Sequence, residues 1–203
     1  MEQRQFPGNL IVVEGPDGSG TTTQAERLAE RLDAVYTAEP GARREEESLI
    51  GEKVDEMISQ EGYSPEAIAL AFAADRMVHV EEKILPLLKE GETLVSDRYY
   101  HSSLVYQPAL GANFRWVRKI NRRAIEPDKT FILDVSAKTG MKRTYSRGED
   151  GDIFESLSFQ QEVVERYRRL PERLEERIEL VEGDRPREEV SMDLVGRLPD
   201  HII

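Results

Sequence analysis

The chain has 203 residues, a length that fits one compact domain with a sizeable core and argues against two independent domains. Its 28 basic and 40 acidic residues give a net charge of -12, so nucleic-acid phosphates and anionic lipid surfaces would repel it. Because the sequence contains no cysteine, disulfides, thiolate zinc sites and a cysteine nucleophile are excluded. We expect a single domain over residues 1–203 that binds neither nucleic acid nor membrane.

The start of the chain is polar and runs directly into a short apolar segment, without the longer apolar stretch of a secretory signal. No segment approaches the roughly 20 apolar residues that a membrane-spanning helix requires. These two features predict a cytoplasmic location.

The first part of the chain predicts a strand, a loop, a helix and a second strand. The apolar, β-branched run at 10–13 ends in a glycine-rich turn, as a buried strand does. Apolar residues then recur at helical spacing over 21–32, opposite a charged face. A second strand is expected at 34–37, because Pro40 and Gly41 end it.

The middle of the chain predicts two helices before a third strand. Apolar spacing indicates a helix over about 50–58, which Gly62 stops. Ser64 is a plausible N-cap for a long helix with Pro65 in its first turn, reaching about Lys89.

The remaining elements continue the alternation. They are a strand at 93–97, a helix at 114–124, a strand at 130–135, a helix at 138–145, a loop at 146–155, a helix at 159–177, a strand at 178–181 and a helix at 187–198. Strands that alternate with helices predict an α/β fold, with a five-stranded, mostly parallel sheet and helices on both faces.

The glycine-rich turn carries the strongest chemical signal. Residues 15–22, Gly15-Pro16-Asp17-Gly18-Ser19-Gly20-Thr21-Thr22, match the phosphate-loop spacing G-x-x-x-x-G-K-[ST] except that Thr21 replaces the lysine. Glycines let backbone N–H groups turn toward phosphate oxygens, while the following helix points its positive end at the same place. The alternative is a turn that is tight only for packing. The preceding strand and the following Thr22 and Thr23 favour ATP binding by residues 15–23, with Thr22 as a magnesium ligand.

The missing lysine removes a charge that normally reaches the β- and γ-phosphates. Catalysis is not thereby excluded, because arginines elsewhere can supply charge to the transferring group.

Motifs over nearly the whole chain, in order, resemble those of the thymidylate kinase family of P-loop nucleoside monophosphate kinases. Besides the phosphate loop they are Ala38-Glu39-Pro40-Gly41, Ala71-Phe72-Ala73-Ala74-Asp75-Arg76, Asp97-Arg98-Tyr99 with Ser102-Ser103-Leu104-Val105-Tyr106-Gln107, Arg143 and Arg147-Gly148 with Phe154-Glu155, and residues 184–190. The chain departs from the family at Thr21, where the family has lysine, and at Ala38, where many members have arginine. Both departures remove positive charge near phosphates.

The resemblance implies a dTMP site. It assigns Phe72 to stacking on thymine and Arg76 to a base oxygen. Helical spacing alone favours a core phenylalanine at Phe72, and the alternative for Arg76 is pairing with a carboxylate. It assigns Arg98 to the acceptor phosphate, against a strand-end salt bridge as the alternative. The implied dTMP-binding set is Phe72, Arg76, Arg98, Ser103, Tyr106 and Gln107.

The same resemblance implies the catalytic and metal residues. Asp17 would help to place the nucleophile, although an ordinary turn residue is the alternative. Arg143 and Arg147 would close over the donor within a short mobile lid at about 142–155, the alternative being a solvated basic face. The implied catalytic set is Asp17, Arg98, Arg143 and Arg147, and the implied Mg²⁺ ligands are Thr22 and Asp97.

The function implied is transfer of the ATP γ-phosphoryl to dTMP, giving dTDP and ADP, with Mg²⁺ as cofactor. Two alternatives stay open. One is a nucleotide-binding module that lost efficient transfer with the lysine, and the other is a kinase for another pyrimidine monophosphate such as dUMP. The resemblance also implies a homodimer.

Overall fold

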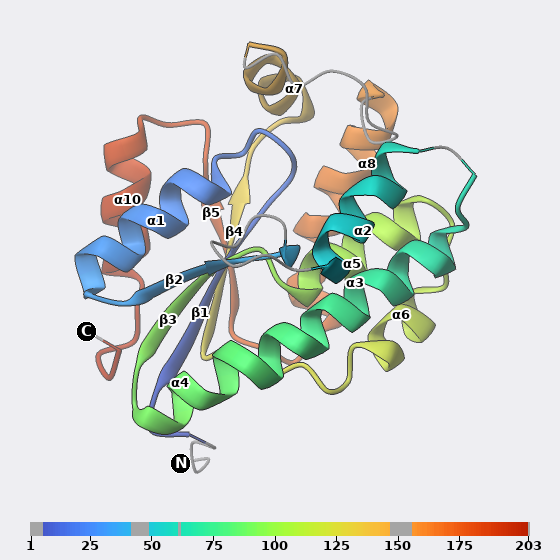
Figure 1. Ribbon diagram of the computed structural model, residues 1–203. Coiled ribbons are helices and arrows are strands. Elements are labelled where there is room, and N and C mark those ends of the chain that lie inside the picture. The colour runs from blue at the N-terminus through green and yellow to red at the C-terminus, as the bar shows by residue number, and fades with distance from the viewer. Residues whose placement is uncertain (1–5, 42–48, 61, 147–155, 203) are drawn as a thin grey trace.

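The computed structural model describes residues 6–41, 49–60, 62–146 and 156–202, which form a five-stranded sheet with helices on both faces (Figure 1). The strands run in the order β2-β3-β1-β4-β5, and all four neighbouring pairs are parallel. They are β1 (Asn9–Glu14), β2 (Val35–Ala38), β3 (Thr93–Asp97), β4 (Lys129–Asp134) and β5 (Ile178–Glu182). The predicted α/β class is confirmed, and the sheet is parallel throughout.

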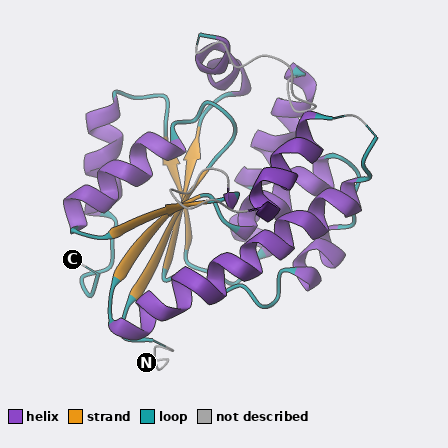
Figure 2. Cartoon of the chain, in the orientation of Figure 1, coloured by secondary structure: helices purple, strands orange, loops and turns teal. Residues whose placement is uncertain are grey.

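The helices divide between the two faces of the sheet, as Figure 2 shows. Helices α1 (Thr21–Leu32) and α10 (Arg187–Gly196) cover one face. The opposite side carries α2 (Leu49–Ser59), α3 (Pro65–His79), the π-helix η2 (Val80–Ile84), α4 (Leu85–Glu90), α5 (Tyr100–Ala109), α6 (Phe114–Ile120), α8 (Leu157–Arg168) and α9 (Leu170–Arg173). Helix α7 (Ala137–Tyr145) lies at the carboxyl end of the sheet. No helix within the described ranges is long and apolar enough to span a bilayer.

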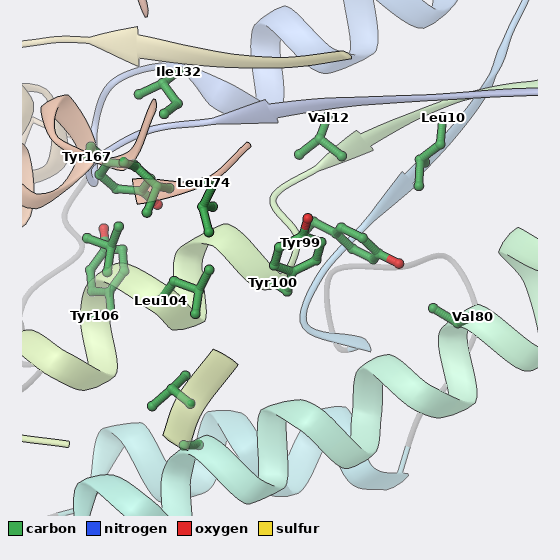
Figure 3. Packing of buried hydrophobic residues seen from close by; sticks show 14 of the residues in the cluster. Leu10, Val12, Val80, Tyr99, Tyr100, Leu104, Tyr106, Ile132, Tyr167 and Leu174 are labelled. Atoms are coloured by element: carbon green, nitrogen blue, oxygen red, sulfur yellow. The ribbon is translucent and has the colours of Figure 1, made fainter. Parts of the chain in front are cut away.

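Central strand β1 separates two apolar cores. Leu10 and Val12 point into the core beneath α3, α5 and α8, part of which Figure 3 shows. Ile11 and Val13 point into the core beneath α1 and α10. Because β1 is covered on both faces, its apolar run is continuous instead of alternating.

Two predicted helices form as the sequence indicates. Helix α1 spans the expected residues 21–32. The segment from Pro65 to Glu90 is one continuous helical rod, and Ser64 caps it by accepting a hydrogen bond from the amide of Ala67 at 3.1 Å. Within this rod the π-helical turn η2 follows His79 directly, a type of turn that is frequent at functional sites.

Three helices differ from expectation. Helix α6 ends at Ile120 because the Asn121 side chain turns back and donates to the carbonyl of Val117 at 2.9 Å. The helix predicted at 159–177 is two pieces, α8 and α9, since Pro171 begins a new turn after Arg169. Helix α5 was not predicted. Most of its residues are buried, so its sequence has no amphipathic pattern.

The topology brings two loops together at the carboxyl edge of the sheet. Strands β1 and β3 are neighbours, yet the chain leaves β1 toward α1 on one face and leaves β3 toward α5 on the other. In parallel α/β sheets, ligands bind in the crevice at such a switch point. The glycine-rich loop after β1 and Arg98 after β3 both lie there.

Candidate active site

The glycine-rich loop at 15–20 is closely packed against α7. Gly18 has φ +74° and Gly20 has φ +95°, which glycine adopts at little cost. A Cβ on Gly18 would lie 2.1 Å from the carbonyl oxygen of Gly140, and one on Gly140 would lie 2.3 Å from that of Asp17. The loop and α7 therefore touch backbone to backbone, which requires glycine at both positions.

The amino end of α1 follows this loop and is open to an anion. The helix has no acidic residue in its first turn, and its first N–H groups have no partner within the helix itself. Thr21, at the position of the family lysine, is buried and 6% exposed. A threonine hydroxyl brings no charge, so the positive end of α1 acts here without a lysine.

Thr22 and Asp97 form a pair suited to a divalent cation. The Thr22 hydroxyl donates to Oδ2 of Asp97 at 2.6 Å. The other oxygen, Oδ1, is buried and has no hydrogen-bond partner in the part of the chain that the structure describes. No group of three acidic or histidine side chains within the described residues could hold a metal ion alone. The pair fits Mg²⁺, which takes one or two carboxylates and completes its shell with phosphate oxygens and water.

Arg98 reaches from the end of β3 to the glycine-rich loop. Its φ of +65° is uncommon for a residue with a side chain, and its N–H is fixed by the carbonyl of Val13 at 2.9 Å. Its guanidinium donates to Asp17 Oδ1 at 2.7 Å and to Ser102 Oγ at 3.1 Å, and lies 5.5 Å from the ring centre of Tyr106. Burial opposes the charge, yet Tyr106 and Asp17 raise the pKa of Arg98 well above its ordinary value.

Glu14 supports the backbone that carries Arg98. This carboxylate is 0% exposed at the end of β1. Its Oε1 accepts from the amides of Tyr99 at 2.8 Å and Ser102 at 3.1 Å, and its Oε2 accepts from the hydroxyls of Ser102 at 2.7 Å and Tyr167 at 2.9 Å. Four donors satisfy the buried carboxylate and tie β1, the start of α5 and α8 together.

Asp17 is held from two sides. Besides Arg98, the buried side chain of Gln160 on α8 donates from Nε2 to Oδ2 of Asp17 at 3.0 Å. The contact orients the loop carboxylate and makes Gln160 part of the site.

Arg76 lies in a second buried network below the site. Its Nε donates to Glu39 Oε2 at 2.7 Å, and its Nη1 donates to Asn121 Oδ1 at 2.5 Å and to Ser103 Oγ at 3.3 Å. His79 Nδ1 lies 3.0 Å from Glu39 Oε1. Arg76 therefore fits both predicted roles. It pairs with a carboxylate, and it lies beside Ser103 of the implied base pocket.

The network keeps Glu39 ionised. Burial alone would raise the pKa of Glu39, but the charges of Arg76 and His79 and their hydrogen bonds outweigh burial, so this pKa is below its ordinary value. The ring of His79 bridges this carboxylate and strand β2, because its Nδ1 lies 3.0 Å from Glu39 Oε1 and its Nε2 lies 2.7 Å from the Thr37 hydroxyl.

The other implied dTMP residues lie on α3 and α5. Phe72 is half-buried, and among the described residues it is not part of either apolar core. Tyr106 is buried beneath Arg98, and burial followed by the charge of Asp17 raises its pKa, so it stays neutral. Gln107 is 2% exposed, and its Oε1 has no hydrogen-bond partner in the described chain. A buried amide oxygen without a hydrogen-bond partner is suited to accept a hydrogen bond from a ligand.

Arg143 on α7 extends over the glycine-rich loop. It donates to the carbonyl of Gly18 at 3.4 Å and to that of Gly183 at 3.4 Å, and lies 3.7 Å from Asp184. These long contacts hold the guanidinium weakly, so it can turn to a ligand. Arg147 and most of the expected lid at 142–155 lie outside the described residues.

Comparison with known proteins identifies the family of the chain. A sequence model of the family described as Thymidylate kinase matches residues 13–194. A probable thymidylate kinase of Pyrococcus abyssi is 38% identical over 203 residues, which cover 97% of this chain and 98% of that protein. One of Thermococcus gammatolerans is 34% identical with 97% and 98% covered, and one of Methanococcus maripaludis is 42% identical with 79% and 76% covered. The chain belongs to the thymidylate kinase family.

Five residues of this site were not among the candidates that the sequence indicated. The structure adds Glu14, Ser102, Asn121, Gln160 and Tyr167 to the residues that the sequence indicated. Only Ser102 lay within a quoted family motif. Glu14 carried a weaker signal, an acid that directly follows an apolar strand. The other three have no local pattern, because their role depends on contacts with residues 45 to 153 positions away.

Proposed function

We propose that this member of the thymidylate kinase family transfers the γ-phosphoryl group of ATP to dTMP, giving ADP and dTDP. The observation that carries the proposal is the 2.7 Å contact between Arg98 and Asp17, which joins an acceptor-side guanidinium to the glycine-rich loop. In the reaction, an oxygen of the dTMP phosphate bonds to the γ-phosphorus while the bond to the β-phosphate oxygen breaks. Such a transfer needs mainly positioning and charge stabilisation.

The donor side is built from backbone and helix dipole. Residues 15–23 bind the triphosphate of ATP through loop amides and the amino end of α1. Arg143 turns from its long carbonyl contacts to the donor, and Arg147, which lies outside the described residues, assists it. These arginines contribute the charge that Thr21 does not.

Thr22 and Asp97 would hold Mg²⁺. The buried, unpartnered Oδ1 of Asp97 supports this assignment for the described part of the site. When bound, the metal supplies charge neutralisation for the phosphate oxygens. Thr22 donates to Asp97 until the metal binds, which keeps the carboxylate oriented.

The acceptor side is built from side chains. Arg98 binds the dTMP phosphate with its planar fork, and Asp17 orients Arg98 toward the loop. Arg76 and Gln107 bind the base, with Ser103 beside Arg76. Phe72 stacks on the base, a role favoured by its absence from the described cores. Tyr106 packs beneath Arg98 and borders the sugar.

The test is ADP release measured with ATP, Mg²⁺ and a panel of monophosphates, dTMP and dUMP among them. We expect turnover to be fastest with dTMP. No turnover above background with dTMP in folded, magnesium-replete enzyme would refute the proposal, and faster turnover with dUMP would reassign the acceptor.

The variant Thr21→Lys tests the alternative that the protein is a nucleotide-binding module without efficient transfer. We expect the wild type to turn over, and the variant to be faster by about tenfold, the effect of roughly 1.4 kcal/mol of added transition-state stabilisation. Calorimetric binding of dTMP without any turnover in the wild type would favour the module.

A homodimer is part of the proposal. On α3, Leu70 is 52% exposed and Met77 is 37% exposed two turns later, with the exposed Ala74 between them. This apolar stripe suits burial against the same helix of a second copy. Sedimentation of the wild type should give a dimer, and Leu70→Glu should give a monomer. A wild-type monomer at micromolar concentration would contradict this part.

A further inference from the structure

A cavity of about 670 Å³ opens beside the pair Thr22 and Asp97. It follows one side of α1, from Thr22 in the first turn to Glu30 in the last. The eight helical steps between these two residues correspond to about 12 Å. The cavity is therefore an elongated groove with one end at the proposed metal site, and its volume is in the range of small-molecule sites.

The groove combines acidic and apolar lining. Glu26 and Glu30 are exposed carboxylates one helical turn apart, and neither has an ion-pair partner among the residues with described positions. Ala29, Ala34 and the half-buried Tyr36 supply the apolar part. Asp97 lies at the inner end, where its Oδ1 is buried and lacks a partner within the described chain. Carboxylates spaced along an apolar wall suit a cation with an aliphatic stem.

An inorganic cation fits the groove less well. A metal ion bound by protein alone needs several converging ligands, and the described residues include no such group of three acidic or histidine side chains. An ammonium group needs only one carboxylate, and methylene groups gain from contact with Ala29 and Tyr36. A linear polyamine satisfies both kinds of lining at once.

A polyamine in this groove would carry the same chemical group as the missing lysine. A lysine side chain is an ammonium on a four-carbon stem, and the aminobutyl arm of a polyamine is the same chemical group. The groove ends at Thr22, next to Thr21, where the phosphate-loop pattern expects lysine.

We propose that the groove along α1 binds a linear aliphatic polyamine, whose ammonium groups pair with Glu26 and Glu30 and whose terminal arm adds the positive charge that Thr21 lacks. The contribution to turnover rests on the proposed kinase activity, whereas binding does not. Binding to the nucleotide-free protein can therefore succeed or fail independently of that activity.

The binding test is calorimetric titration of the nucleotide-free protein with spermidine, at constant ionic strength set with NaCl. We expect one saturable site, and a loss of at least about tenfold in affinity in Glu26→Gln/Glu30→Gln, the effect of roughly 1.4 kcal/mol. The matched control is Glu81→Gln/Glu82→Gln, which removes the same charge from two exposed residues of η2 and should bind like the wild type.

Two results would overturn the binding proposal. They are the absence of saturable binding and an equal loss of affinity in the control variant. Either result would indicate diffuse attraction of a cation to an acidic protein.

The second arm measures turnover with dTMP. Spermidine should raise kcat of the wild type by about tenfold and leave Thr21→Lys unchanged. Equal stimulation of both proteins would refute the substitution for lysine, while the calorimetric result would still stand for the site.

Discussion

Arg76 and Thr22 illustrate how differently the two sides of the site are held. Arg76, on the proposed acceptor side, is 2% exposed and bonded to Glu39, Asn121 and Ser103. Thr22, on the proposed donor side, is exposed, and among the described residues its side chain hydrogen-bonds only to Asp97. We therefore propose that the acceptor side is fixed before a nucleotide binds, while the donor side is completed by its ligand. Changes on the acceptor side should cost stability, and changes on the donor side should cost rate.

The largest expected effect on stability is that of Glu39→Gln. The change leaves Arg76 buried without its carboxylate, and breaking a buried ion pair in this way costs about 3–5 kcal/mol. Urea unfolding measures the loss. Glu188→Gln is the control, since Glu188 pairs with Arg27 at the surface and this variant should lose much less stability than Glu39→Gln. Equal losses in both variants would contradict a preformed acceptor side.

The largest expected effect on rate is that of Arg98→Lys. Lysine keeps the charge but cannot reproduce the fork that bonds Asp17 and Ser102, so kcat/KM for dTMP should fall by about 100-fold. Steady-state ADP release measures this, with the surface variant Arg197→Lys as control. A variant as fast as the wild type would remove Arg98 from the proposed mechanism.

Gly140→Ala should affect the donor side. The added methyl group would lie 2.3 Å from the backbone carbonyl of Asp17, which forces the glycine-rich loop to move. Overpacking of this kind costs about 1–3 kcal/mol. We expect a raised KM for ATP with KM for dTMP little changed, measured by varying each nucleotide in turn. Gly196→Ala is the control, because a Cβ there meets nothing within 4 Å.

The smallest expected effect is the pH dependence that Glu39 contributes. Its pKa in the folded protein is below the ordinary value of 4.5, so its stabilising contribution is complete above about pH 4.5 and is lost as the pH falls through the folded-state pKa. The difference in unfolding free energy between wild type and Glu39→Gln should therefore shrink below pH 4.5. A difference that stays constant from pH 7 to pH 3 would show that Glu39 is not the ionised partner of Arg76.

Local pattern predicted much of the fold. Helix α1 and strand β1 follow from apolar spacing and a glycine-rich turn, which act over neighbouring residues. Helix α5 gave no such signal, because a helix buried on most sides has no polar face. The π-turn at Val80–Ile84 was also unpredictable, since one widened turn hardly changes the apolar period.

The candidate site was likewise predictable only where its residues form a local sequence motif. The phosphate loop is visible in sequence because its residues are consecutive, and the family motifs indicated Arg76 and Arg98. The contacts that these residues make with one another and with Gln160 were not visible. Glu39 lies 37 positions from Arg76 and Gln160 lies 143 positions from Asp17, so only the folded chain reveals these contacts.

The most direct test is a crystal structure with dTMP, Mg²⁺ and a non-hydrolysable ATP analogue bound together. We expect the triphosphate on the amides of residues 15–22, the metal between Thr22 and Asp97, and the dTMP phosphate bonded to Arg98, with the Glu39 and Arg76 pair unchanged. A monophosphate bound elsewhere, or a rearranged Glu39 and Arg76 pair, would contradict a preformed acceptor side opposite a donor loop.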